Sequence, residues 1–442
     1  MNVPSRYVIR GATASAVAAS VEDAVRTGAL PLGAPLPPVR ALAAQLGLSA
    51  ATVASAYRSL RLRGLAAGAG RRGTRVTARP PLVVGRPSPR ASGLRDVAEG
   101  NPDPRLLPPL RAHRARLGAA ATLYGAPAAL PELIRLATKD LGRDGIPVAH
   151  LAVMGGALDG IERVLQSHLR PGDAVAVEDP GYTAVLDLIG ALGLVPRPVA
   201  LDDSGPLPGE LDRALRSGAQ AFVFTPRAQN PTGAAVDAAR ARQLRQVLDG
   251  HPNALVVEDD HAGPVAGVAA RTVCDGDRAR WAVVRSVSKS LGPDLRLAIL
   301  AGDAGTVARV RGRQAVGAGW VSHILQGLVA ALWSDPSCDA RLRRAADAYA
   351  ERRRRLLDAL AAHGVIGTGR SGLNVWVPVR EEAATIAHLA ARGWAVRAGE
   401  RYRMKSPPAI RITVSTLTAR EAAQLAADVA ESQRGGGRTS AA

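Results

Sequence analysis

Apolar residues recur at helical spacing near the start of the chain. Val17, Val21 and Val25 lie four residues apart, with Thr13 before them and Gly28 after them. Because a threonine can cap the start of a helix and a glycine can end one, this pattern predicts an amphipathic helix over 13–27.

Two more short helices are predicted next. Leu36-Pro37-Pro38-Val39-Arg40 opens the first, since proline is tolerated in the first turn of a helix. Ser49 can cap the second, over roughly 50–63, and a glycine- and arginine-rich hairpin follows over 68–76. Two short helices joined by a tight turn and followed by a basic hairpin predict an α+β winged helix-turn-helix domain over 1–77.

The pattern changes further along the chain. Residues 78–95 are rich in proline and arginine, which predicts an extended, semi-rigid linker. From about residue 96 short apolar runs alternate with helical stretches, so we expect an α/β domain with a mostly parallel sheet. The expected strands are Ala174–Val177, Ala221–Phe224, Ala254–Val257, Trp281–Arg285 and Leu297–Ala301.

The larger part of this domain is expected over about 120–310, and a smaller C-terminal α+β part over about 311–432. The smaller part includes a strand at Leu373–Val377. Arg352–Arg355 lies in a long helical stretch, and we expect it to form a solvated face. The glycine-rich end, 433–442, is expected to be disordered.

The net charge is uneven along the chain. Residues 1–95 hold fourteen arginines against two acids, Glu22 and Asp23, and so carry +12 of the formal +19. A basic block of this kind favours a polyanion, most simply nucleic acid. The alternatives are a protein-interaction module and an arginine-rich composition without a role, and both explain the helix-turn-helix pattern less well.

Composition excludes several other classes. The 442 residues are 47% apolar but only 3% aromatic, so small aliphatic side chains must fill a large core. The two cysteines, Cys274 and Cys338, lack metal or disulfide spacing, which fits a reducing cytosol. We find no secretory pattern and no apolar run of membrane-spanning length, and we expect no metal site.

Chemistry-bearing residues gather around Val283-Val284-Arg285-Ser286-Val287-Ser288-Lys289-Ser290, followed by Arg296. A desolvated lysine can form a Schiff base with an aldehyde, and serine hydroxyls and a guanidinium can hold a phosphate. The chain has only two other lysines, Lys139 and Lys405. Taken alone, a solvated loop lysine is the commoner explanation. Candidate residues at the ends of the other expected strands favour a different explanation, a site for an aldehyde cofactor that carries a phosphate.

Candidate residues follow several of the other expected strands. Gly155-Gly156-Ala157 precedes a helix over Leu158–Leu169 and can hold a phosphate, although such a turn is often only a turn. Tyr182 can stack on a planar ring or simply pack. Asn230 lies in a turn and can hydrogen-bond a phenolate oxygen. Asp259 can pair with a protonated pyridine nitrogen or cap a helix.

The N-terminal segment resembles the GntR family of DNA-binding domains. The resemblance rests on Leu36-Pro37-Pro38-Val39-Arg40-Ala41-Leu42-Ala43, Leu48-Ser49-Ala50-Ala51-Thr52-Val53 and Tyr57-Arg58-Ser59-Leu60. It implies DNA contacts from the start of the second and third helices, and hairpin arginines would meet phosphates or the minor groove. The expected DNA-binding residues are Arg40, Ser49, Thr52, Arg58, Arg71 and Arg72. Ala50 departs from the arginine that is frequent there.

The second domain, expected at 96–435, resembles the class I/II aminotransferase fold (fold type I), which binds pyridoxal 5′-phosphate. The resemblance covers about 120–430. The resemblance implies that Lys289 forms the Schiff base, Asp259 pairs with the pyridine nitrogen, Asn230 contacts the ring hydroxyl and Tyr182 stacks on the ring. It implies a phosphate cup of Gly156, Ala157, Ser286 and Arg296, with Ser288 beside it. Tyr124 would reach the phosphate of a neighbouring subunit, and Arg411 would grip a substrate or effector carboxylate. Among the departures, His261 stands where tyrosine or alanine is frequent, and Asp159 lies in the phosphate turn.

Both halves in one chain resemble the MocR subfamily of bacterial transcription regulators. The resemblance implies a cytoplasmic, nucleoid-associated homodimer that binds operator DNA. Pyridoxal phosphate, alone or with an amino-compound effector, would control that binding. The rival prediction is a true aminotransferase with an amino acid substrate and a vestigial DNA-binding segment. A third is a sensor of pyridoxal phosphate alone that controls vitamin B6 synthesis.

Overall fold

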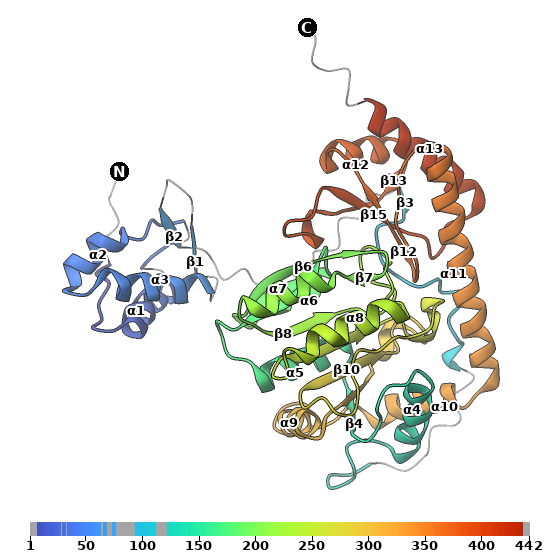
Figure 1. Cartoon of the computed structure of the whole chain (residues 1–442), viewed down its shortest axis with the longest axis horizontal. Coiled ribbons are helices and arrows are strands. Elements are labelled where there is room, and N and C mark those ends of the chain that lie inside the picture. Colours follow the sequence, from blue (N-terminus) through green and yellow to red (C-terminus); the bar gives the residue numbers. More distant parts are fainter. Residues whose placement is uncertain are drawn as a thin grey trace. The chain divides into compact units, whose positions relative to one another are not determined.

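The computed structural model describes residues 7–27, 29–31, 33–62, 65–68, 73–76, 93–111 and 122–435 (Figure 1). It divides into two compact units. The first comprises Met1–Pro89 with the short segments Arg170–Ala174 and Asp187–Pro196, and the second comprises the rest of the chain.

Three helices and a hairpin form the N-terminal domain. They are α1 (Ala14–Arg26), α2 (Val39–Leu46), α3 (Ala50–Leu62), β1 (Ala66–Gly68) and β2 (Thr74–Val76), and the two strands pair antiparallel. Thr13 caps α1 as expected, since its hydroxyl accepts a hydrogen bond from the Ala16 amide at 3.2 Å. Gly47 ends α2 with φ 67°, a left-handed conformation that glycine adopts without strain. The predicted winged helix-turn-helix is therefore present.

Tyr57 holds the two helices of the helix-turn-helix together. Its ring is buried in the domain core, and its hydroxyl donates to the Pro37 carbonyl at 2.7 Å. Burial raises the pKa of Tyr57 to about 12, so the phenol remains a donor. The buried core side chains around it are Ile9, Val17, Ala18, Val21, Leu36, Leu42, Ala43, Val53, Ala56, Leu60, Leu65, Ala66 and Val76.

An eight-stranded sheet forms the centre of the larger domain. Its order is β4-β11-β10-β9-β8-β5-β6-β7. The bounds are β4 Leu151–Met154, β5 Ala174–Asp179, β6 Val195–Asp202, β7 Gly205–Pro206, β8 Ala219–Phe224, β9 Leu255–Asp260, β10 Trp281–Ser286 and β11 Ala298–Gly302. β8, β9 and β10 are parallel, and β11 runs antiparallel to both of its neighbours. The carboxyl ends of β4, β8, β9 and β10 therefore meet at one edge, where ligands bind in sheets of this kind.

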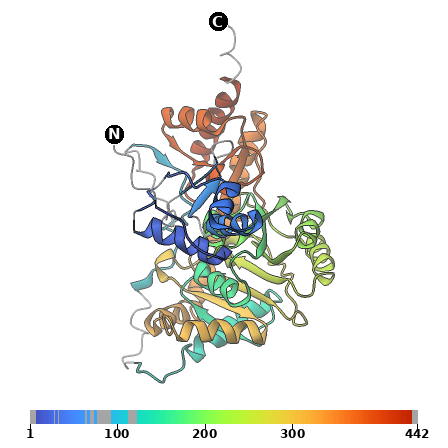
Figure 2. The same cartoon turned by 90° about the vertical axis from the view of Figure 1, so that its left-hand side faces the viewer.

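Helices link these strands. They are α4 (Pro131–Arg143), α5 (Ala157–His168), α6 (Thr183–Ala191), α7 (Pro208–Arg216), α8 (Ala238–Asp249), α9 (Ala304–Ala315) and α10 (His323–Trp333). Figure 2 shows the sheet in green and yellow, turned by 90° from Figure 1. α5 packs on β9, β10 and β11, so the turn that precedes it reaches the edge where the strands end.

The C-terminal part contains a second, smaller sheet. Its strands β12 (Asn374–Pro378), β15 (Ala409–Thr413) and β14 (Arg397–Ala398) lie in that order. A short strand from the start of the domain, β3 (Arg95–Asp96), pairs in parallel with β13 (Trp394–Ala395). The helices are α11 (Pro336–Ala362), α12 (Glu382–Ala391) and α13 (Ala419–Gly435).

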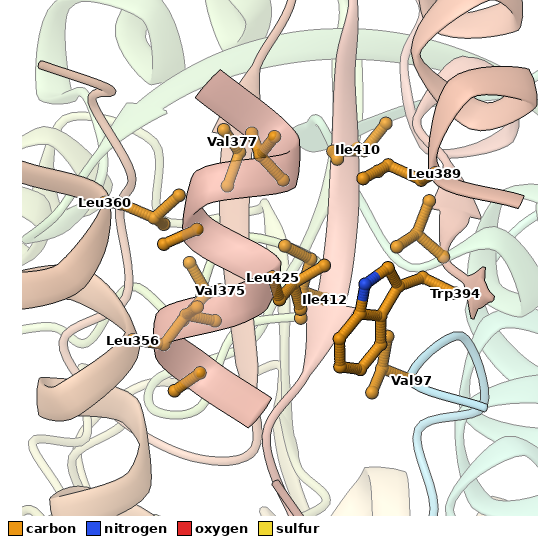
Figure 3. Close-up of a cluster of buried hydrophobic side chains, with 14 of the residues drawn as sticks. Val97, Leu356, Leu360, Val375, Val377, Leu389, Trp394, Ile410, Ile412 and Leu425 are labelled. Atoms are coloured by element: carbon orange, nitrogen blue, oxygen red, sulfur yellow. The ribbon is translucent and has the colours of Figure 1, made fainter. Parts of the chain in front are cut away.

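Val97 lies inside the hydrophobic core of this smaller part (Figure 3). It packs in one cluster with Leu356 and Leu360 of α11, Val375 of β12 and Ile412 of β15. The segment that leads in from the N-terminal domain is thus part of the smaller C-terminal fold.

The expectation that Arg352–Arg355 forms a solvated face is wrong for two of the four. Arg353 is buried and donates to the carbonyls of Gly369, Arg370 and Gly372 at 2.9, 3.0 and 2.7 Å. Arg352 donates to Asp103 Oδ2 at 3.1 Å. Arg354 and Arg355 do face solvent, so the arginine run spans the buried and exposed sides of α11.

The described residues contain neither a single membrane-spanning helix nor a metal-binding cluster. No single helix there has the length and apolar character to cross a membrane; Val39–Leu46 and Ala50–Tyr57 qualify only as a pair bent by 119°. No group of three His, Cys, Asp or Glu side chains in that part of the chain is placed to hold a metal ion.

Candidate functional site

Asp259 lies near the end of β9 with an unused carboxylate oxygen. Its side chain is 2% exposed, and in the described part of the chain Oδ1 has no hydrogen-bond partner. Burial, and then the charge of Asp260, raises the pKa of Asp259 to about 7. A buried acceptor without a donor is costly, so this atom fits a cationic or N–H partner supplied by a ligand.

The next residue, Asp260, faces a buried ion-pair network. It accepts from Arg227 Nε at 2.9 Å and from Arg285 Nε at 2.7 Å, and Asp144 contacts both guanidinium groups at 3.0 and 2.6 Å. Although burial opposes it, the arginine charges hold the pKa of Asp260 well below its ordinary value. The network fixes the ends of β8, β9 and β10 against α4, and Asp259 stays available on the other face of β9.

Lys289 lies three residues after the end of β10 at Ser286, in the loop that follows this strand. Its Nζ donates to the Gly100 carbonyl. Burial, and then the charge of Arg411, lowers the pKa of Lys289 to about 8. An amine with this pKa is partly uncharged near neutral pH, which is the form that attacks a carbonyl group.

Gly156 and Arg296 form one wall of the expected phosphate cup. A Cβ on Gly156 would lie 3.1 Å from Arg296 Nη2, and Gly156 has φ 117°, so only glycine fits here without strain. Arg296 is exposed, and no hydrogen bond or ion pair holds its guanidinium within the described ranges. Ala157 begins α5, and Asp159 accepts from the Gly155 amide at 2.9 Å.

The two serines of the cup contact each other. Ser286 Oγ donates to Ser288 Oγ at 3.0 Å, and the Ser288 amide donates to Ser286 Oγ at 3.1 Å. Together with Arg296 and the start of α5 they present hydroxyl, guanidinium and amide donors, which are the groups that bind a phosphate.

Arg411 reaches the site from β15. It is buried, donates to Asn230 Oδ1 at 3.0 Å and to the Ala98 carbonyl, and its guanidinium lies 5.2 Å from the centre of the Tyr402 ring. Nε of Arg411 is buried without a partner in the described residues. The structure thus brings two of the predicted ligand contacts, Asn230 and Arg411, into direct contact.

Tyr182 and His261 complete the described site. Burial and then the charge of Asp259 raise the pKa of Tyr182, and Arg411 and Arg296 oppose the shift, so the phenol lies within electrostatic reach of all three. Burial and then the charge of Lys289 lower the pKa of His261 to about 4. His261 therefore stays neutral beside the lysine at neutral pH.

Tyr124 lies on the surface. It is 92% exposed, and its ring lies edge-on to that of Trp320, with ring centres 5.6 Å apart. Leu123, Val316 and Ile324 are also strongly exposed. An exposed apolar and aromatic group of this kind is typical of a protein–protein contact, so a role for Tyr124 in a neighbouring subunit stays a prediction.

The residues present fit pyridoxal phosphate. Asp259 Oδ1 supplies the acceptor that a protonated pyridine nitrogen needs, Lys289 the amine, and the Gly156–Arg296 wall a cationic pocket that a Cβ would obstruct. These roles rest on chemistry and position, and they remain predictions.

In the N-terminal domain three of the six expected DNA contacts are described in full. Arg40 is exposed in the first turn of α2. Ser49 Oγ accepts from the Thr52 amide at 3.0 Å and lies 2.8 Å from the Thr52 hydroxyl, so both also cap α3. The side chain of Arg58, and Arg71 and Arg72 altogether, lie outside the described residues.

Family comparisons match both parts of the chain. The model of bacterial regulatory proteins of the gntR family matches residues 13–76, and that of aminotransferase class I and II matches residues 94–429. The chain belongs to the MocR subfamily of GntR-type transcription regulators.

Relatives of this MocR protein are named regulators. It is 41% identical to the vitamin B6 salvage pathway transcriptional repressor PtsJ of Salmonella typhimurium, over 96% of this chain and 99% of that protein. It is 29% identical to the HTH-type transcriptional regulator TauR of Rhodobacter capsulatus, over 80% of each chain. Among solved structures, the kynurenine aminotransferase of Pyrococcus horikoshii matches with a TM-score of 0.73 at 20% identity, over 79% of this chain and 93% of that one. That likeness confirms the aminotransferase fold of the larger domain.

Sequence reasoning missed two features of the site. One is the segment Ala98–Gly100, whose carbonyls contact Arg411 and Lys289. The other is the network of Asp260, Arg227 and Arg285. Backbone carbonyls leave no signal in a sequence. Arg227 and Arg285, however, stand next to strand ends, and because a buried arginine needs an acidic partner, their positions could have predicted an ion pair.

Proposed function

We propose that this MocR regulator is a repressor of vitamin B6 genes and that pyridoxal 5′-phosphate bound at Lys289 changes its affinity for operator DNA. The observation that carries the proposal is the presence of both a partly uncharged lysine and Asp259, whose buried Oδ1 has no hydrogen-bond partner among the described residues. The 41% identity with a vitamin B6 salvage pathway repressor over nearly the whole length supports the regulatory role.

Each residue of the site has a physical task toward the cofactor. Pyridoxal phosphate supplies an aldehyde that condenses with an amine and a pyridine ring that withdraws electrons when it is protonated. Lys289 provides the amine, and Asp259 keeps a proton on the ring nitrogen by its charge. Asn230 and Tyr182 orient the ring, and Ser286, Ser288 and Arg296 hold the phosphate with the amides at the start of α5.

Operator binding is assigned to the N-terminal domain. Arg40 on α2 and the start of α3 would contact the DNA, with the hairpin arginines on phosphates. A homodimer would present two such domains to two half-sites, and Tyr124 would complete the partner's phosphate cup. We expect the protein to act in the cytoplasm, on the nucleoid. An amino compound with a carboxylate for Arg411 is the further effector class.

A specific observation also favours the alternative function, transamination. The chain has Lys289, Asp259, Asn230 and Arg411, and Arg411 donates to Asn230 Oδ1, an arrangement that would suit a substrate carboxylate. Rapid multiple turnover of an amino acid with an oxo acid, without specific DNA binding, would establish the enzyme instead.

The deciding experiment is operator binding by the purified full-length protein. The DNA is the region upstream of its own gene, with and without pyridoxal phosphate, over a range of salt concentrations. We expect site-specific binding that changes at least fivefold with the cofactor in the wild type and not in Lys289→Ala. Lys139→Ala is the matched control, because Lys139 is exposed on α4. Binding that ignores both sequence and cofactor would contradict the proposal.

A further inference from the structure

A short segment at the start of the larger domain lies across the candidate site. The Gly100 carbonyl accepts from Lys289 Nζ, and the Ala98 carbonyl accepts from Arg411 Nη2. A Cβ on Gly100 would lie only 3.6 Å from Arg411 Nη1, so the backbone rests against the guanidinium. Residues 98–100, which we call the latch, thus accept hydrogen bonds from Lys289 and Arg411. These are the side chains that a cofactor and a carboxylate ligand would bind.

The latch has its own supports. The amides of Ala98 and Glu99 both donate to Asp96 Oδ1, at 2.8 and 3.1 Å, which closes a tight turn. Glu99 forms an ion pair with Arg397 of β14. The turn is therefore fixed from inside by Asp96 and from the smaller sheet by Arg397.

The residues just before the latch are anchored in the smaller sheet. The Val97 amide donates to the Ala395 carbonyl at 3.0 Å, and the Val97 carbonyl accepts from the Thr413 amide at 2.8 Å. Val97 is 1% exposed in the core shown in Figure 3. Before Val97 the chain leads back through residue 93 to the sequence that joins this domain to the DNA-binding domain.

We propose that the latch is the element through which the ligand site acts on the segment leading to the DNA-binding domain, an inference that rests on the proposed function. Condensation of Lys289 with the cofactor's aldehyde replaces both hydrogens of the neutral amine by a C=N bond and releases them with the aldehyde oxygen as water. The product nitrogen would keep no hydrogen of its own, and a proton taken up by it would be shared with the adjacent ring hydroxyl oxygen, so the Gly100 carbonyl would lose its donor. Residues 98–100 are then held in the site by Arg411 alone, and the loss of the other anchor loosens the adjoining backbone pairs of Arg95 and Val97 with Gly393 and Ala395.

A carboxylate ligand would act on the second contact. It would compete with the Ala98 carbonyl for Arg411, because a charged acceptor binds a guanidinium more strongly than a neutral carbonyl does. Pyridoxal phosphate alone thus breaks one contact of the latch, and a carboxylate ligand that has no amine to exchange with Lys289 would break both. The ligand class that releases the latch fully is therefore a carboxylate that leaves the Lys289 imine intact, whereas an α-amino acid that displaces Lys289 from the aldehyde carbon would return the amine to Gly100.

Hydrogen exchange of the full-length protein tests the release directly. Adding pyridoxal phosphate is expected to raise the exchange rate of the Ala98 and Glu99 amides at least fivefold. The Val97 amide, bonded to Ala395, should follow with a smaller increase, and the Trp376 amide, bonded to Thr368, is the internal reference and should not change. Lys289→Arg keeps a charged donor but cannot condense with an aldehyde, and its latch should not respond.

Operator binding tests the coupling. Glu99→Gln removes the ion pair to Arg397, so without cofactor its operator affinity should already lie near the cofactor-bound value of the wild type. The remaining change on adding pyridoxal phosphate should fall at least threefold. Glu351→Gln is the matched control, because Glu351 pairs with Arg354 and Arg355 on the exposed side of α11. Arg397→Gln provides a second variant that removes the same ion pair from the other side.

The outcomes separate the two proposals. Suppose that pyridoxal phosphate binds and changes operator affinity while exchange at 98–100 stays constant. The latch is then wrong and the proposed function stands. If operator affinity is indifferent to the cofactor in the wild type, both are wrong. A Glu99→Gln protein that responds like the wild type would also overturn the latch.

Discussion

Arg411 Nη1 donates to Asn230 Oδ1 across 3.0 Å and so joins strand β15 of the smaller sheet to the turn after β8 of the larger one. The two side chains are 181 positions apart in the chain. Arg411 also lies over Tyr402, which leaves the planar guanidinium with little freedom to turn. A carboxylate would meet a cation that is already oriented.

The planarity of that guanidinium gives the first prediction. Arg411→Lys keeps the charge, but an ammonium cannot hold Asn230 and Ala98 while it binds a carboxylate through two parallel bonds. The concentration of amino acid that perturbs the absorbance of bound pyridoxal phosphate should rise about tenfold or more, equivalent to about 1.4 kcal/mol. Affinity for amines without a carboxylate should not change, and a parallel loss for both ligand types would argue against this role.

Asp259 gives a prediction about pH. Burial raises the pKa of Asp259 to about 7, whereas an unfolded aspartate titrates near its ordinary value. Between about pH 4 and 7 the folded state holds a proton that the unfolded state lacks, so stability falls as pH rises through this window. Asp259→Asn should remove part of that fall, about 2–4 kcal/mol at pH 8.

The measurement is the thermal unfolding midpoint of the larger domain at pH 5 and pH 8, without cofactor. Glu178 and Glu258 are also buried, with pKa values raised to about 8 and about 7, so the variant should flatten the dependence without abolishing it. Asp260 titrates below this window because its pKa is lowered, and it does not contribute. If the unfolding midpoint of Asp259→Asn changes between pH 5 and pH 8 as much as that of the wild type, Asp259 does not hold a buried proton.

Gly156→Ala is predicted to weaken cofactor binding at least tenfold. The new Cβ would lie 3.1 Å from Arg296 Nη2, at φ 117°, so it would both strain the turn and push the guanidinium away. A strained residue of this kind costs about 1–3 kcal/mol. Titration with pyridoxal phosphate measures the effect. Gly142→Ala in helix α4 is the control, since nothing lies within 4 Å of its Cβ position and affinity should be unchanged.

Arg353 is predicted to stabilise the folded state through its buried hydrogen bonds. Arg353→Met leaves the carbonyls of Gly369, Arg370 and Gly372 without their donor, and each lost bond is worth about 0.5–1.5 kcal/mol. We expect a loss of about 2–4 kcal/mol, measured by urea unfolding at pH 7. Arg354→Gln, which removes exposed ion pairs one position along, should change stability by less than about 0.5 kcal/mol. Equal effects would show that burial does not distinguish the two arginines.

Arg40→Ala tests the DNA interface. A phosphate or base contact from this exposed arginine should be worth about tenfold in operator affinity, and the slope of log affinity against log salt should fall by about 1 if the contact is to a phosphate. Gln45→Ala, also exposed on α2, is the control. An Arg40→Ala protein with wild-type affinity and slope would exclude Arg40 from the interface.

Local patterns in the sequence were sufficient for much of this protein. The cap at Thr13, the left-handed Gly47 and the strands that carry Asp259 and Ser286 follow from spacing and residue type over a few positions. The strand ends were placed a few residues early, since β9 runs to Asp260 and β5 to Asp179. Acids at these ends look like loop residues until their burial is known.

Long-range partners were beyond the same reasoning. Arg353 looks like its three arginine neighbours in the sequence, because only the fold brings carbonyls from residues 369–372 to it. The contact of Gly100 with Lys289 joins positions 189 apart and uses a backbone oxygen, which every residue has. Periodicity identifies which side of a helix is buried, but it does not identify what lies opposite.

The pairing of β3 with β13 limits how such a protein could have been assembled from two genes. Arg95–Asp96 and Val97 belong to the fold of the smaller sheet although they precede the whole larger sheet in the chain. A recombination that attaches a different DNA-binding domain before Arg95 leaves this strand and its core side chain in place. One that joins after Val97 removes both, and the transferred half would arrive with an unfilled core. Exchange of DNA-binding domains among such genes is therefore expected to have its crossover points before Arg95.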